Sequence, residues 1–108
     1  MVYSIEELKE LIAPVAKKYR LSAVYLFGSY ARNEATDDSD VDVLIDRAGS
    51  SVKSMFDMGA LYNDLYESIG KEVDLVTTYA LTQDSTKDRT PWFTDNVMRE
   101  RVAVYEQQ

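Results

Sequence analysis

Apolar residues follow two different periods along this chain. In two stretches they recur every three or four residues, the spacing that places them on one face of a helix. The first stretch begins after Ser4, which together with Glu7 forms a capping-box sequence, and the second ends at Gly70, a residue type that commonly terminates helices. The pattern therefore predicts two long helices. Their apolar positions are Ile5, Leu8, Leu11, Ile12, Val15 and Tyr19 in the first and Met55, Met58, Leu61, Tyr62, Leu65 and Ile69 in the second.

Three short runs rich in β-branched or aromatic residues predict strands, at residues 23–27, 41–46 and 72–77. A short helix is expected over 29–33 and a loop over 47–51. The last apolar positions suggest a final helix; they are Phe93, Val97, Val102 and Tyr105. This order of elements predicts an α+β fold, with an α/β-type order, in which helices flank a small mixed sheet.

Two residue types inside the predicted helices carry further expectations. Pro14 lies within the first helix and should kink or split it, because proline cannot donate the interior helical hydrogen bond. Met55 and Met58 begin the second helical pattern, where methionine usually fills gaps in a core. We therefore expect both methionines to be packing residues.

Composition narrows the class of protein and the chemistry open to it. A chain of 108 residues, with 45% hydrophobic and 29% charged residues, is typical of one soluble domain, here residues 1–108. No apolar stretch approaches the ~20 residues that span a bilayer, and the N-terminus lacks a signal-peptide pattern, so we expect no membrane association and a cytoplasmic location. The chain has no cysteine and no histidine, which excludes thiolate metal sites and imidazole bases. Acid–base chemistry must therefore use carboxylates.

The net charge of −7 also bears on possible partners. An acidic surface repels the phosphate backbone of nucleic acids, and no basic patch is visible in the sequence. We therefore expect no direct nucleic-acid binding by this domain.

The strongest chemical signal is a pair of carboxylates at the start of the second predicted strand. Side chains alternate along a strand, so Asp40 and Asp42 point to one face while Val41, Val43 and Ile45 point to the buried face. Two neighbouring carboxylates repel each other unless a cation lies between them. Mg²⁺ is the usual cation, because it binds a few carboxylate oxygens together with water and substrate phosphates.

A phosphate-binding sequence precedes this pair. The first predicted strand ends at Phe27. Gly28 follows it and allows a close backbone approach, and Ser29 opens the short helix with a hydroxyl and free N–H groups. Arg32 lies one helical turn further on, within reach of a phosphate oxygen. Metal-binding carboxylates beside a phosphate site are typical of phosphoryl or nucleotidyl transfer, in which two ions steady the attacking and leaving oxygens.

In these residues the chain resembles the nucleotidyltransferases of the DNA polymerase β-like superfamily, and more narrowly the minimal nucleotidyltransferases (MNT). Their pattern reads Gly-Ser-x-Ala-Arg-Gly followed by Ser-Asp-x-Asp. The matching positions here are Gly28, Ser29, Ala31, Arg32, Ser39, Asp40 and Asp42. Asn33 replaces the last glycine, and asparagine is one of the few residues that tolerate a positive φ.

The resemblance implies a polymerase β-like fold and roles for individual residues. Gly28, Ser29, Arg32 and Ser39 would bind the nucleotide, and Asp40 and Asp42 would hold two Mg²⁺ ions. A third acidic residue in a following apolar-Asp-apolar strand maps to Asp74, as a metal ligand or as the base that accepts the nucleophile's proton. Glu72 lies on the same strand face and competes for this role.

The resemblance also implies a partner. Minimal nucleotidyltransferases are commonly antitoxins, which neutralise a small helical HEPN-type toxin by moving AMP from ATP to a toxin tyrosine. We therefore expect a Mg²⁺-dependent adenylyltransferase that forms a hetero-oligomer with such a toxin. Two alternatives remain: an antitoxin that acts by binding alone, and a subunit that nucleotidylates a small molecule such as an aminoglycoside.

Overall fold

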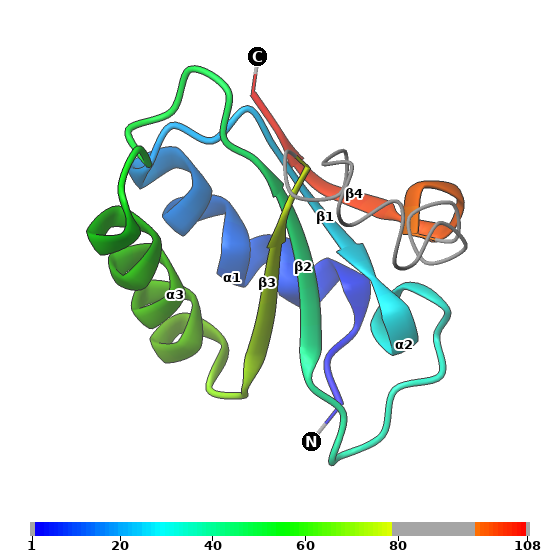
Figure 1. Ribbon diagram of the computed structural model, residues 1–108. Coiled ribbons are helices and arrows are strands. Elements are labelled where there is room, and N and C mark those ends of the chain that lie inside the picture. The colour runs from blue at the N-terminus through cyan, green and yellow to red at the C-terminus, as the bar shows by residue number, and fades with distance from the viewer. Residues whose placement is uncertain (1, 79–96, 108) are drawn as a thin grey trace, which may run out of the picture.

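The computed structural model describes residues 2–78 and 97–107 of the chain. Its elements are α1 (Ile5–Lys18), β1 (Ala23–Phe27), α2 (Gly28–Ala31), β2 (Val41–Asp46), α3 (Met55–Ile69), β3 (Val73–Thr77) and β4 (Val102–Glu106). The strands form one mixed sheet in the order β3-β2-β1-β4. β1 runs antiparallel to both β2 and β4, whereas β2 and β3 are parallel. The α+β fold with a mixed sheet is confirmed (Figure 1).

Local capping fixes the ends of the two long helices. The Ser4 side chain accepts a hydrogen bond from the Glu7 backbone, and the Glu7 side chain accepts one from the Ser4 backbone, so the predicted capping box is formed. A second capping box, between Ser54 and Asp57, starts α3. Gly70 ends α3 with φ of 75°, a left-handed conformation that glycine adopts without a steric penalty.

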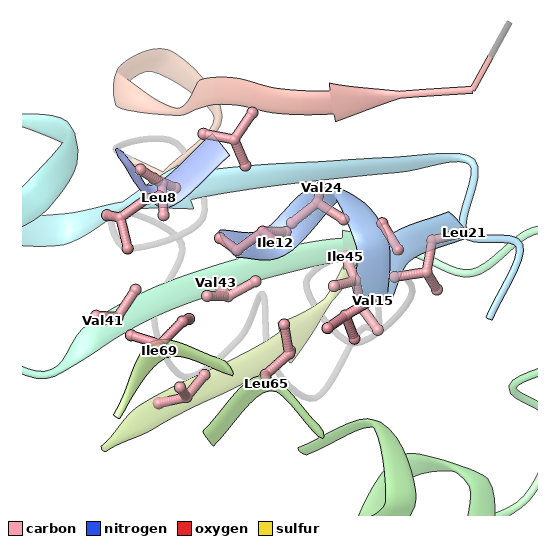
Figure 2. Close-up of a cluster of buried hydrophobic side chains, with 14 of the residues drawn as sticks. Leu8, Ile12, Val15, Leu21, Val24, Val41, Val43, Ile45, Leu65 and Ile69 are labelled. Atoms are coloured by element: carbon pink, nitrogen blue, oxygen red, sulfur yellow. The ribbon is translucent and has the colours of Figure 1, made fainter. Parts of the chain in front are cut away.

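The main hydrophobic core lies between one face of the sheet and helices α1 and α3. Figure 2 shows side chains from both helices meeting those of the strands. The apolar positions of β2 point into this core and are fully buried; they are Val41, Val43 and Ile45. The predicted alternation of β2 is therefore confirmed, and its intervening residues must face the other side of the sheet.

The opposite face of the sheet carries a second and smaller cluster. It consists of the buried residues Phe27, Leu44 and Val97, with Tyr25 and Val76 packed against them. Val97 belongs to a helical turn over 97–100, which leads directly into β4. This turn therefore lies on the face of the sheet to which β2 points its carboxylate.

The expectation of a final helix reaching Val102 and Tyr105 is wrong. Helical structure covers 97–100, but Val102–Glu106 form β4, because this segment pairs with the open edge of β1. That edge pairing joins segments that are far apart in the sequence, and local spacing does not reveal it. Phe93, from the same predicted helix, lies outside the described residues.

Three smaller expectations differ from the structure. Met55 is 89% exposed and fills no core, whereas Met58 packs partly against the main core. Pro14 does not split α1; it lies on the exposed side of one continuous helix. The short helix begins at Gly28 and ends at Ala31, since Asn33 takes a positive φ of 60°. Among residues 2–78 and 97–107, no helix has the length and apolar character needed to cross a membrane.

Candidate active site

The sheet brings the phosphate-binding sequence and the carboxylates to one end of three neighbouring strands. Phe27, the last residue of β1, pairs with Asp42 near the start of β2. Asp42 in turn pairs with Asp74 in the parallel strand β3. Gly28 directly follows Phe27, so the Gly-Ser sequence, Asp42 and Asp74 lie side by side although they come from three separate segments.

Gly28 and Asp42 are in direct contact. Gly28 has φ of 69°, and a Cβ added there would overlap the Oδ2 atom of Asp42. Both the backbone conformation and the available space therefore require glycine at this position. The carboxylate of Asp42 lies against the backbone that was predicted to bind phosphate.

Electrostatics indicate that the predicted carboxylates are close together. The pKa of Asp42 is raised to about 6, first by partial burial and then by the negative charges of Asp74 and Asp40. The positive charge of Arg32 acts in the opposite direction and lowers it. Asp40 and Asp74 are themselves exposed, so Asp42 is the most enclosed of the three.

Arg32 is held by two carboxylates that the sequence analysis did not single out. Its Nε donates to Glu34 Oε2 at 3.2 Å, and its Nη1 donates to Glu100 Oε2 at 3.1 Å. These ion pairs raise the pKa of Arg32. Glu34 is only two positions from Arg32, but Glu100 is 68 positions away, and only the fold brings it here.

The loop before Asp40 is ordered by its own side chains. The Ser39 hydroxyl accepts a hydrogen bond from the Thr36 backbone at 2.9 Å, and the Ser39 backbone donates to the Thr36 carbonyl at 3.0 Å. Ser39 therefore shapes this loop, and its predicted contact with nucleotide stays a prediction.

Lys71, which sequence reasoning missed, donates from Nζ to the Tyr30 hydroxyl and to the Asp37 carbonyl, both at 3.1 Å. It thereby connects α2, this loop and the start of β3.

Glu72 and Asp74, the two candidates for the third carboxylate, have different surroundings. Glu72 precedes β3, and its Oε2 atom accepts a hydrogen bond from the Tyr62 hydroxyl of α3 at 2.9 Å. Asp74 pairs with Asp42 and raises its pKa. The geometry therefore groups Asp74, rather than Glu72, with Asp42.

The donor set at this end of the sheet fits a hard divalent cation. The groups are carboxylate oxygens. The pKa of Asp42 is raised first by burial and then by neighbouring negative charges, which a cation would neutralise. Within 2–78 and 97–107, no group of three or more acidic side chains is arranged so that it could hold a metal ion. Mg²⁺ does not require one, since it commonly uses one or two carboxylates and completes its shell with water and substrate phosphates.

A separate cavity of about 760 Å³ lies at the other end of β2. Its lining includes Asp46, Arg47, Gly49 and Lys53. Because Asp42 lies near the start of β2 and Asp46 at its end, this cavity is distinct from the carboxylate site.

The sequence matches a known family over most of its length. Residues 9–108 match the family model described as "Polymerase beta, Nucleotidyltransferase". A predicted protein adenylyltransferase of Methanocaldococcus jannaschii is 41% identical over 86 residues, which cover 80% of this chain and 89% of the relative. The protein adenylyltransferase MntA of Thermococcus cleftensis is 32% identical over 105 residues, which cover 94% of this chain and 96% of the relative.

Solved structures agree with this fold. A predicted minimal nucleotidyltransferase superposes with a TM-score of 0.69 and 28% identity, covering 93% of this chain and 95% of that one. A crystal structure of a toxin–antitoxin with AMP-PNP contains a chain with a TM-score of 0.68 and 22% identity, covering 93% of this chain and 74% of that one. A structure of a tri-AMPylated Shewanella oneidensis HEPN toxin with its MNT antitoxin contains a chain with a TM-score of 0.64 and 18% identity, covering 96% of this chain and 74% of that one. The last two likenesses concern the fold alone. From its sequence match and its architecture, the chain belongs to the polymerase β-like nucleotidyltransferase family.

Proposed function

We propose that this protein is an adenylyltransferase that transfers AMP from ATP to a tyrosine of a HEPN-type toxin and thereby acts as its antitoxin. The observation that carries the proposal is the placement of Asp42 against the Gly28 backbone and beside Asp74. Support for the acceptor comes from the relatives named protein adenylyltransferase and from the AMPylated toxin in the Shewanella oneidensis complex.

The nucleotide would bind at the end of β1. Backbone N–H groups after Gly28 and the Ser29 hydroxyl would donate to the β- and γ-phosphates, with Arg32 as an additional cation. Ser39 is a further candidate contact from the loop. The close approach of Asp42 to Gly28 would place the carboxylates beside the bound triphosphate.

Asp40, Asp42 and Asp74 would hold two Mg²⁺ ions in this site. Bound there, the ions would neutralise the triphosphate charge and stabilise the attacking and leaving oxygens. Asp74 would accept the proton of the tyrosine hydroxyl as its oxygen attacks the α-phosphorus. A new phosphorus–oxygen bond forms to the tyrosine, the bond to the β-phosphate breaks, and pyrophosphate leaves.

Support for the proposed partner comes from the relatives, because a structure of an AMPylated HEPN toxin with its MNT antitoxin contains a chain of the same fold. A second protein would then supply the acceptor hydroxyl. The protein would form a hetero-oligomer with the toxin. We assign this activity to the single domain of residues 1–108 and to the cytoplasm, and both assignments stay predictions from the sequence.

Intact-mass spectrometry tests this proposal. The protein is co-expressed with its HEPN-type partner and supplied with ATP and Mg²⁺, beside an Asp40→Asn/Asp42→Asn double variant whose circular dichroism confirms folding. We expect the partner mass to rise in whole AMP units with the unchanged protein and to stay constant with the variant. A partner that is neutralised equally by both, without a mass change, would instead establish an antitoxin that acts by binding.

A further inference from the structure

The Arg32 guanidinium, a predicted phosphate ligand, is already bound by two carboxylates. Glu34 accepts from Nε and Glu100 accepts from Nη1, at 3.2 and 3.1 Å. Two of the N–H groups that an arginine can donate to phosphate are therefore already donated to carboxylate oxygens. Arg32 is nevertheless close enough to the site for its charge to lower the pKa of Asp42.

Glu100 is fixed in position by contacts that do not involve Arg32. Val97, at the start of the same helical turn, is buried against Phe27 and Leu44. The Arg101 backbone closes the turn by donating to the Val97 carbonyl at 2.9 Å. The Arg101 guanidinium also lies over the Tyr25 ring, 4.3 Å from its centroid. Contacts on both sides of Glu100 therefore hold it beside α2.

We propose that Glu100 competes with the nucleotide triphosphate for Arg32: it binds the guanidinium while the site is empty and is displaced when the phosphates bind. The proposal rests on the proposed function, because it requires that a nucleotide bind beside Gly28 and Arg32. The Glu100 carboxylate accepts a hydrogen bond from the guanidinium in the empty site, and a phosphate of the bound nucleotide would accept it instead.

The energetics allow this exchange. The Arg32 and Glu100 side chains are 43% and 40% exposed, and ion pairs this open to water contribute little to stability. A triphosphate carries several negative charges and offers bidentate oxygens, so it binds the guanidinium more strongly than one exposed carboxylate. Competition of this kind lowers the apparent affinity for nucleotide without changing the reacting groups.

A double-mutant cycle on nucleotide affinity tests the competition. Binding of a fluorescent ATP analogue with Mg²⁺ is measured for the unchanged protein, Glu100→Gln, Arg32→Ala and the double variant. We expect Glu100→Gln to tighten binding about two- to five-fold, the range of one exposed ion pair. In the Arg32→Ala background the same substitution should have no effect, since the competed group is gone.

Glu67→Gln is the matched control, because it removes the same charge from an exposed position of α3. It should leave the affinity unchanged. Weaker nucleotide binding by Glu100→Gln would overturn the proposal. An equal gain in affinity with and without Arg32 would also overturn it, because it would show a general effect of the removed charge. Failure of the unchanged protein to bind nucleotide at all would count against the proposed function instead. A loss of structure in Glu100→Gln cannot imitate the expected gain in affinity.

Discussion

Gly28 and Asp42 pack against each other so closely that one added carbon atom would overlap. The glycine has no Cβ, and the space that a Cβ would fill is taken by the carboxylate of Asp42. The positive φ of Gly28 adds a second reason for glycine at this position. The spacing of the two motifs predicted that they would meet, but the contact between these atoms depends on the pairing of Phe27 with Asp42.

Gly28→Ala should therefore reduce AMP transfer by about 100-fold, because the added methyl group displaces the Asp42 carboxylate. Gly49→Ala is the matched control: Gly49 has a similar φ of 71°, but a Cβ there meets nothing within 4 Å. Both substitutions should cost about 1–2 kcal/mol of folding free energy through backbone strain. Steady-state rates measure the effect on AMP transfer, and urea unfolding measures the effect on folding free energy. An equal loss of activity in both variants would contradict the role of the contact between Gly28 and Asp42.

The raised pKa of Asp42 predicts a pH-dependent stability in metal-free protein. The folded state binds this proton more tightly than the unfolded state, so the contribution of Asp42 to stability falls as pH rises from about 4 to about 6. Asp42→Asn removes this loss. In EDTA the variant should be more stable than wild type by about 1–2 kcal/mol at pH 8, after allowance for partial exposure, and about equal to it at pH 4.

Urea unfolding at the two pH values measures this difference. Asp46→Asn, at the other end of β2, serves as the control carboxylate. A gain in Asp42→Asn that is the same at pH 4 and pH 8 would show that its source is not the titration of the carboxyl group.

At the scale of elements, local signals and tertiary pairing determined different parts of the fold. β1 and β2 were predicted with their observed bounds, because their apolar runs are strong and flanked by glycine or aspartate. β4 was mistaken for helix because Val97, Val102 and Tyr105 can be spaced as a helix, and only its pairing with β1 makes Val102–Glu106 a strand. The same long-range packing brings Glu100 to Arg32, which explains why this contact could not be predicted.

Pro14 within α1 supplies a prediction at this scale. It is exposed inside a continuous helix, where it cannot donate the interior backbone hydrogen bond. Pro14→Ala should raise the free energy of unfolding by about 1–3 kcal/mol, less than the full helix-propensity difference because the unfolded chain also gains freedom. Lys17→Ala, at an exposed position of the same helix, should change stability little. Urea denaturation checks both, and a destabilised Pro14→Ala would be the contrary result.

At the scale of the whole molecule, the sheet divides structural and chemical roles between its two faces. Helices α1 and α3 cover one face of the sheet (Figure 1), and the core between helices and sheet includes the apolar residues of β2. The other face carries Asp42 beside the Phe27–Leu44–Val97 cluster. The alternation along β2 predicted that Asp42 lies on the face opposite Val41, Val43 and Ile45. Burial of the apolar Leu44 on the carboxylate face depends on its packing against Phe27 and Val97.

The central claim is that the protein breaks the bond between the α- and β-phosphates of ATP and moves AMP to its partner. The most direct measurement supplies the complex with Mg²⁺ and ATP labelled either at the α- or at the γ-phosphate and follows label on the partner. Nucleotidyl transfer predicts label from α-labelled ATP only, and none with the Asp40→Asn/Asp42→Asn variant. Label from γ-labelled ATP would show phosphoryl transfer, and would contradict the assignment of Asp40, Asp42 and Asp74 to adenylylation.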